Sequence, residues 1–213
     1  MADEMFLDRA DAGRRLAEAL RARFAGKVVV LGIPRGGVIV AAAVARALRA
    51  PLDVVLPRKI GAPRNPELAI GAIATGIQVW DLGLIRRLGV PAEYLRTEVR
   101  AQEAEIERRS MRYRSGRGPL SLDAAEVVIV DDGIATGATA AAAVRLVRSQ
   151  GAGRAVLAVP VAPPDAVERL GKEADEVVVL ETPWDFRAVG EWYEAFGQTT
   201  DEEVVRAMAD AAG

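Results

Sequence analysis

The chain has 213 residues, of which 51% are apolar and 27% charged, so it is long enough to form one domain with a substantial core. It contains neither cysteine nor histidine, which excludes disulfides, cysteine nucleophiles, His-ligated zinc and Ser-His-Asp catalysis. The net charge of −2 provides no overall basic field, which disfavours a nucleic-acid partner.

The sequence also lacks an apolar run long enough to span a bilayer, and residues 1–10 carry no signal-peptide pattern. We therefore expect a cytoplasmic protein with no membrane partner. The sequence leaves the oligomeric state open, a homo-oligomer included.

The first fifty residues predict a helix, a strand and a second helix. Residues 8–24 have an amphipathic helical pattern, residues 27–32 form an apolar run, and residues 38–48 are rich in Ala. Between the strand and the second helix stands Pro34-Arg35-Gly36-Gly37. An Arg among small residues at a helix start can bind an anion, although a plain turn with a solvent-facing Arg has the same composition.

A second strand is predicted over residues 52–56, and Pro57–Pro66 follows it. Three prolines, one glycine and three cations in this segment indicate a mobile basic loop, in which Arg64 has the weakest claim to a functional role. Residues 68–74 and 77–80 predict two strands around Thr75-Gly76.

Residues 91–114 predict one long helix. Arg and Glu alternate along it, which is typical of a solvated or partner-facing helix and again disfavours nucleic acid.

The most informative stretch is residues 127–139. Its four β-branched residues, 127–130, are typical of a strand buried on both faces of a parallel sheet. Asp131 and Asp132 follow, then a loop of small residues, and then a helical stretch over residues 138–147. Free N–H groups at a helix start suit a phosphate, whereas carboxylates suit hydroxyl groups. The combination indicates a sugar phosphate, and an ordinary capped βα turn is the alternative.

The remainder of the chain predicts strands at 154–159 and 176–180 with a helix at 164–170 between them. The fold class is therefore α/β, a doubly wound, mostly parallel sheet flanked by helices. In such folds ligands bind at the carboxyl ends of the strands. Residues 200–203, Thr-Asp-Glu-Glu, predict one more helix start near the end of the chain.

Residues 127–139 resemble the phosphoribosyl-pyrophosphate motif of type I phosphoribosyltransferases. The resemblance implies that Asp131 and Asp132 bind the ribose hydroxyls. It also implies that the 5-phosphate is bound by the residues of the following loop, which are Gly133, Ile134, Ala135, Thr136, Gly137, Ala138 and Thr139.

The same resemblance assigns Arg35, Gly36 and Gly37 to a pyrophosphate loop. It implies that the segment carrying Arg58 and Lys59 closes over the reacting centre and meets the pyrophosphate. Asp131, Asp132, Arg35 and Lys59 are then the expected catalytic residues. Mg²⁺ would arrive with the pyrophosphate substrate, so we assign it no protein ligand.

In this family the terminal segments form a hood over the acceptor. We expect residues 1–213 to form a single phosphoribosyltransferase-like domain, with a helical insertion near 91–114 and a small hood near 181–213. Trp184 and Phe186 follow a strand end and are the expected contacts to a base. We expect Trp192, Tyr193 and Phe196 to pack as a small satellite core.

The implied function is transfer of phosphoribose from phosphoribosyl pyrophosphate to a nitrogenous acceptor, with a nucleobase as the expected acceptor and a nucleoside monophosphate as product. Ala135 stands where hypoxanthine-type members carry an acid, so the acceptor is not identified. A non-catalytic nucleotide-sensing regulator on the same fold and an unrelated sugar-phosphate-binding domain are the alternatives.

Overall fold

The computed structural model describes residues 5–74 and 77–211, and a five-stranded parallel sheet forms its centre. In chain order the elements are α1 (Arg9–Leu20), β1 (Val28–Gly32), α2 (Gly36–Leu48), β2 (Leu52–Val54), β3 (Arg58–Ala62), β4 (Asn65–Ala74), β5 (Ile77–Trp80), α3 (Leu82–Leu88), α4 (Ala92–Arg114), β6 (Glu126–Val130), α5 (Ala138–Ser149), β7 (Arg154–Val161), α6 (Pro164–Leu170), β8 (Glu176–Glu181), the 3₁₀ helix η1 (Val189–Trp192) and α7 (Asp201–Asp210).

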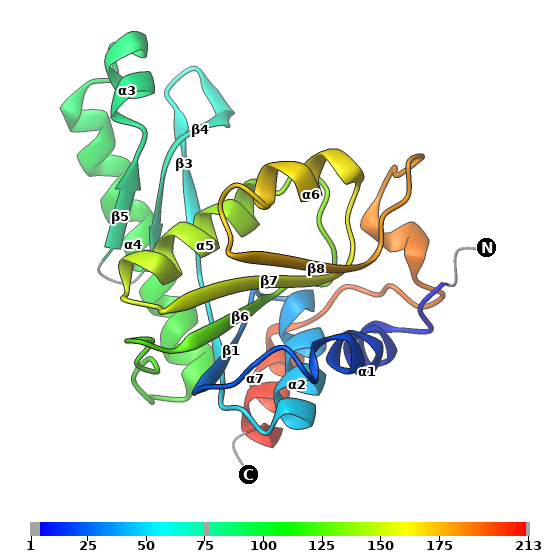
Figure 1. The fold of residues 1–213 in the computed structure, drawn as a ribbon. Coiled ribbons are helices and arrows are strands. Elements are labelled where there is room, and N and C mark those ends of the chain that lie inside the picture. Colours follow the sequence, from blue (N-terminus) through cyan, green and yellow to red (C-terminus); the bar gives the residue numbers. More distant parts are fainter. Residues whose placement is uncertain (1–4, 75–76, 212–213) are drawn as a thin grey trace.

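The central sheet has the strand order β2-β1-β6-β7-β8, and every neighbouring pair is parallel. Figure 1 shows α5 and α6 above the sheet and α1, α2 and α7 below it. Val128 and Val130 of β6 pack on the lower side, whereas Val127 and Ile129 pack on the upper side. Both faces of β6 are therefore buried, which explains its unbroken apolar run and confirms the predicted fold class.

Local signals place the helix starts at both ends of the chain. The Asp8 side chain accepts a hydrogen bond from Asp11 N at 2.7 Å and caps α1. Thr200 and Glu203 form a reciprocal capping box at the start of α7, where the sequence predicted a helix start.

The segment 57–66 differs from the expected loop, because it forms β3 and the start of β4 in a three-stranded antiparallel sheet, β3-β4-β5. Its prolines permit this: Pro57 precedes β3, Pro63 lies in the turn, and Pro66 lies beside the register shifts at Gly61. The turn expected at Thr75-Gly76 lies outside the described residues. The short helix α3 was not predicted.

Helix α4 lies against this hairpin and is anchored at its end. Arg114 Nε lies 2.7 Å from Asp53 Oδ1 in an ion pair in which both side chains are buried. The Tyr113 hydroxyl donates to Asp201 at 2.6 Å and so joins α4 to α7. The helix is thus held to the sheet by buried polar bonds in addition to the apolar contacts of Ile106.

The segment before α1 pairs with the segment around η1 beside the sheet. Phe6 N donates to Trp192 O at 2.9 Å, and Glu194 N donates to Phe6 O at 2.8 Å. The rings of Phe6 and Tyr193 lie 5.3 Å apart in a small cluster, which confirms the expected satellite core for Tyr193. Among the described helices, none has both the length and the apolar character that crossing a bilayer requires.

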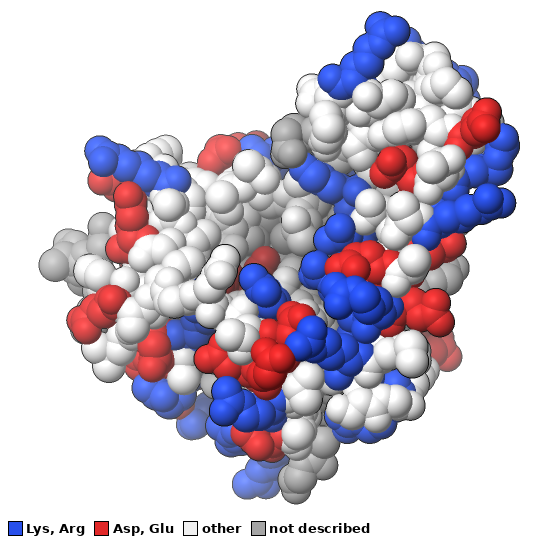
Figure 2. All heavy atoms as spheres, turned by 180° about the vertical axis from the view of Figure 1, so that it is seen from behind, with Lys and Arg blue, Asp and Glu red and all other residues white. Residues whose placement is uncertain are grey.

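Charged side chains are mixed on the surface. Figure 2 shows Lys and Arg interleaved with Asp and Glu across one face of the molecule, with no continuous basic stripe on that face among the residues described.

Candidate functional site

Two loops meet at the carboxyl edge of the central sheet. Strands β1 and β6 pair in register from Val28–Glu126 to Gly32–Val130, so both end at the same level. Ile33 N then donates to Val130 O at 2.8 Å, which extends the pairing by one residue. The Pro34–Gly37 loop and the acidic pair, predicted separately from sequence, are therefore neighbours.

Glycine is required where these loops touch. A Cβ added at Gly36 would lie 1.9 Å from Asp132 Oδ2, and one added at Gly37 would lie 2.7 Å from Asp131 Cα. A side chain at Gly37 would clash with the backbone and push the two loops apart, and one at Gly36 would displace the Asp132 carboxylate. The close approach places the acidic pair directly against the start of α2.

The two carboxylates have different surroundings. Asp132 Oδ2 accepts a hydrogen bond from Arg9 Nε at 2.7 Å, whereas Asp131 Oδ1 accepts from the Asp132 backbone N at 2.9 Å. Burial and the neighbouring charge of Asp132 raise the pKa of Asp131 well above its usual range, and the Arg9 charge opposes this shift. One carboxylate is thus paired with a cation and the other is largely desolvated.

Arg9 is a site residue that sequence reasoning missed. Its guanidinium also donates to Gly197 O at 2.7 Å and lies 4.0 Å from the centroid of the Phe196 ring. Residues 193–199, here the terminal segment, also contribute the Tyr193 hydroxyl, which donates to Asp132 O at 2.5 Å. The one local signal for Arg9 was its place just after the capping Asp8, which is insufficient to distinguish it among many Arg residues.

The loop after the acidic pair leads into α5 as predicted. Gly137 precedes the helix with a φ of 74°, in the left-handed region that favours glycine. It has no side chain to cap the helix, so N–H groups of the first turn remain available to an anion. Ile134 is buried and its N–H donates to Val161 O at 2.9 Å, which fixes the loop to β7. The other expected loop residues are at least partly exposed, namely Gly133, Ala135, Thr136, Ala138 and Thr139.

A cavity of about 570 Å³ opens over these groups. It is lined by Arg9, Ile33, Pro34, Arg35, Gly36, Asp131, Asp132, Thr139, Phe196, Gly197, Gln198 and Thr199. It therefore brings together the acidic pair, the first loop, the start of α5 and the terminal segment, which are far apart in the sequence. We call it the acidic cavity.

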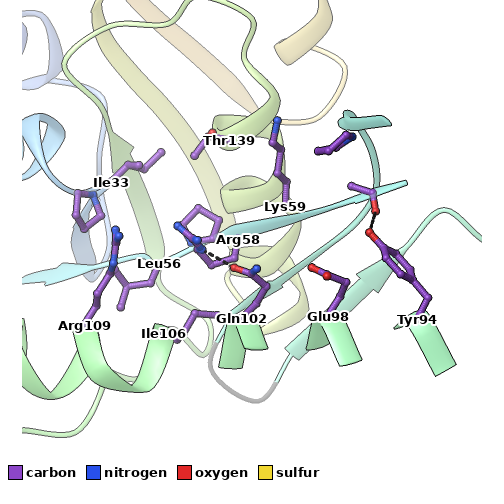
Figure 3. A pocket seen from close by; sticks show the side chains of 14 residues that line it. Ile33, Leu56, Arg58, Lys59, Tyr94, Glu98, Gln102, Ile106, Arg109 and Thr139 are labelled. Atoms are coloured by element: carbon purple, nitrogen blue, oxygen red, sulfur yellow. Dashed lines mark hydrogen bonds between the residues drawn. The ribbon is translucent and has the colours of Figure 1, made fainter. Parts of the chain in front are cut away.

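A second cavity of about 480 Å³, here the α4 cavity, lies between the hairpin and α4. Its lining residues are Ile33, Pro34, Leu56, Pro57, Arg58, Lys59, Gly61, Pro66, Tyr94, Glu98, Gln102, Ile106, Arg109 and Thr139. Figure 3 shows Arg58 joined to Gln102 across it, through a hydrogen bond of 2.8 Å from Nε. Because Ile33, Pro34 and Thr139 line both cavities, the two adjoin.

The expected cations are thus divided between the cavities. Arg35 lies at the start of α2 in the acidic cavity, with Nη1 at 4.0 Å from Asp201 Oδ1. Arg58 and Lys59 line the α4 cavity and project from a strand, although sequence placed them on a loop.

The placement expected for Trp184 and Phe186 is not the one observed. Trp184 is 91% exposed, and it lines neither the acidic cavity nor the α4 cavity. Phe186 packs against the satellite core. After β8 ends at Glu181, Trp184 projects into solvent and Phe186 packs on the satellite core, so following a strand end did not bring these rings to the acidic pair. Phe196 lies beside that pair instead.

Comparison with known proteins gives relatives along nearly the whole chain. Proteins from two strains of Mycobacterium tuberculosis, whose names mark them as candidate phosphoribosyl transferases, are 52% identical over 204 residues. The match covers 95% of this chain and 46% of each relative, so the chain spans about half the length of these curated relatives.

Solved structures are also similar. The crystal structure of TT1426 from Thermus thermophilus is 47% identical with a TM-score of 0.89, covering 98% of this chain and all of that one. The AQ2163 protein of Aquifex aeolicus shares the fold with a TM-score of 0.50 at 14% identity, covering 82% of this chain and 74% of that one. The model of the phosphoribosyl transferase domain matches residues 4–195. The chain therefore belongs to the phosphoribosyl transferase domain family.

Proposed function

We propose that this chain binds phosphoribosyl pyrophosphate and transfers its phosphoribosyl group to a nitrogenous acceptor, with a nucleobase as the leading candidate. The observation that carries the proposal is the contact of the acidic pair with Gly36 and Gly37, beside the start of α5. It brings groups for hydroxyls, for a phosphate and for a pyrophosphate around one cavity.

Each part of the substrate has a complementary group. The 5-phosphate would accept hydrogen bonds from the N–H groups at the start of α5, helped by Thr136 and Thr139. The ribose hydroxyls would donate to the oxygens of Asp131 and Asp132. The pyrophosphate would extend toward the start of α2, near Arg35, and toward the cations of β3.

In the reaction, the lone pair of an acceptor nitrogen forms a bond to C1 of the ribose. The bond between C1 and the pyrophosphate oxygen breaks, its electron pair leaves with the pyrophosphate, and the acceptor's N–H proton passes to water. The protein's role is to orient the two reactants and to stabilise the charge that gathers on the leaving group.

Magnesium belongs to the same proposal. The carboxylate oxygens of Asp131 and Asp132 are hard ligands of the kind that Mg²⁺ takes, so the residues present fit this ion. Bound with the pyrophosphate, it would supply positive charge to the phosphate oxygens. In the described residues no group of three or more acidic side chains gathers into a metal site, and we therefore leave most of its ligands to the substrate.

The remaining parts of the proposal concern organisation. Residues 1–213 would act as one domain in the cytoplasm, with the helix near 91–114 as an insertion. Residues 181–213 would form the hood, and Phe196 rather than Trp184 or Phe186 would meet the acceptor, since its ring lines the acidic cavity.

One observation favours a second candidate, a nucleotide-sensing regulator. Asp132 is held by Arg9 at 2.7 Å, so ribose hydroxyls must compete with an ion pair for this carboxylate. A regulator can tolerate that arrangement, because it needs to bind a nucleotide without promoting chemistry at C1.

The test measures pyrophosphate release from phosphoribosyl pyrophosphate with Mg²⁺ and a panel of nucleobases, with calorimetric binding beside it. Release that depends on one acceptor and is lost in Asp131→Asn supports the transferase. Binding without release for every acceptor supports the regulator. If neither phosphoribosyl pyrophosphate nor a nucleoside monophosphate binds, both candidates are wrong.

A further inference from the structure

Helix α4 presents one continuous face to the α4 cavity. Tyr94, Glu98, Gln102, Ile106 and Arg109 recur at helical spacing and all line it. Figure 3 shows Arg109 rising from α4 toward Ile33, at the place where the α4 cavity adjoins the acidic cavity. A helix expected to be solvated or partner-facing therefore forms a wall of the α4 cavity.

The charge of the cavity suits an anion. Three cations, Arg58, Lys59 and Arg109, line it, and among the described residues Glu98 is its one lining carboxylate. The cations come from two elements, because Arg58 and Lys59 belong to β3 and Arg109 belongs to α4. Cations that converge from separate elements can surround a polyanion such as pyrophosphate.

Arg109 also lies on the side of the molecule where Arg35 lies. Both guanidinium charges, with that of Arg112, help to lower the pKa of Asp201, although the hydrogen bond from Tyr113 is the main cause. Arg35 Nη1 lies 4.0 Å from Asp201 Oδ1, and the charge of Arg109, from α4, acts on the pKa of the same carboxylate. The pyrophosphate assigned to Arg35 would lie within the field of both.

The geometry of Arg109 leaves it able to bind an anion. Its Nε donates to Glu105 Oε1 at 2.6 Å, which orients the guanidinium through a bond that uses one edge only. Because this bond fixes the orientation of the guanidinium, the two Nη groups are held in place and can donate to phosphate oxygens. Its neighbour Arg108 binds the same Glu105, at 2.8 Å, but does not line the cavity.

We propose that Arg109 is a further pyrophosphate-binding residue of this chain, supplied by helix α4. The proposal rests on the proposed function, because it assigns Arg109 to the leaving group of that reaction. As the bond between C1 and oxygen breaks, the electron pair moves onto the pyrophosphate, and Arg109 stabilises the charge there. Arg109 thus gives α4 a direct part in the chemistry.

The test compares Arg109→Gln with the matched control Arg108→Gln, since both changes remove one of the Arg partners of Glu105. Calorimetry measures the affinities of the full chain for phosphoribosyl pyrophosphate with Mg²⁺ and for ribose 5-phosphate. We expect Arg109→Gln to weaken the binding of phosphoribosyl pyrophosphate roughly tenfold or more and to leave the affinity for ribose 5-phosphate unchanged. Arg108→Gln should leave both affinities unchanged, and Arg109→Lys, which keeps the charge, should lose less than Arg109→Gln.

Each contrary result has a separate meaning. If Arg109→Gln binds phosphoribosyl pyrophosphate as tightly as the parent, or if it weakens both ligands equally, the assignment of Arg109 is wrong while the proposed function stands. If the parent binds neither ligand, the proposed function fails and the assignment fails with it. The thermal unfolding midpoint of each variant shows whether it is folded. If Arg109→Gln is not folded, the affinity of Arg109→Lys for phosphoribosyl pyrophosphate, compared with that of the parent, decides the assignment of Arg109.

Discussion

Replacing Gly137 by Val tests both what the backbone requires at this position and whether the loop binds the 5-phosphate, as proposed. Gly137 has a φ of 74°, and an L-residue in that conformation costs roughly 1–2 kcal/mol. The added Cβ would also lie 3.1 Å from Leu170 Cδ1, the flexible end of a side chain that can shift. We therefore expect Gly137→Val to lower the free energy of unfolding by about 2 kcal/mol.

Binding should suffer in addition to stability, because Gly137 stands directly before the N–H groups proposed to hold the 5-phosphate. Losing or misdirecting one hydrogen bond to a charged group costs about 1.5–3 kcal/mol, which corresponds to roughly ten- to a hundredfold in affinity. The ligand for this measurement is ribose 5-phosphate, titrated calorimetrically, since it has no pyrophosphate to bind elsewhere.

Gly116 provides the matched control. Its φ is 81°, and a Cβ added there would meet nothing within 4 Å. Gly116→Val therefore has a similar backbone cost but lies outside the proposed site. Urea unfolding should show similar destabilisation of both variants, whereas only Gly137→Val should lose affinity for ribose 5-phosphate. Equal affinities of Gly137→Val, Gly116→Val and the parent for ribose 5-phosphate would show that this loop does not bind the 5-phosphate.

Other contacts give three more predictions. Trp184→Ala should leave calorimetric affinity for a nucleoside monophosphate unchanged, because the ring is 91% exposed; a tenfold loss would return it to the acceptor site. Arg114→Met should lower the urea-unfolding free energy by about 3–5 kcal/mol, since it leaves Asp53 buried without its ion-pair partner, and a loss below about 1 kcal/mol would contradict this. Burial and the bond to Asp201 raise the pKa of Tyr113 from 10.0 to about 12. The neutral Tyr113 therefore stabilises the fold fully below pH 10, and this contribution, on the order of 2 kcal/mol, should disappear as the pH rises to 12. In Tyr113→Phe the fall in unfolding free energy between pH 10 and 12 should be smaller by that amount, and an unchanged fall would contradict the assignment.

Local patterns were sufficient for the parallel sheet and its acidic edge. Residues 127–130 are β-branched because both faces of β6 are buried, and that requirement is visible in four consecutive letters. The small residues after Asp132 likewise reflect a backbone requirement, which the positive φ of Gly137 confirms. Such features depend on neighbours in the chain, so a single sequence contains them.

The hairpin shows where local patterns were insufficient. Pro57, Pro63 and Pro66 suggested a loop, but each takes a position where a strand tolerates it. Antiparallel pairing with β4 makes a strand of Arg58–Ala62. The same limit applies to the rings, since Phe196 reaches the acidic cavity only because residues 192–195 pair with Phe6 and Leu7.

The sequence by itself determined that this chain would place two carboxylates and a small-residue loop at the end of a buried strand. Only the tertiary structure decided which cations would lie beside them and which would line the adjoining α4 cavity. Arg9 and Arg109 stand on helices among many other Arg residues, and nothing in their neighbours distinguishes them. Arg9 reaches Asp132 across 123 positions of sequence, because α1 lies against α2 and Arg9 bonds to Gly197 of the terminal segment. Charge acts through space over a few ångströms, so the role of an arginine depends on the groups that the fold brings within that distance.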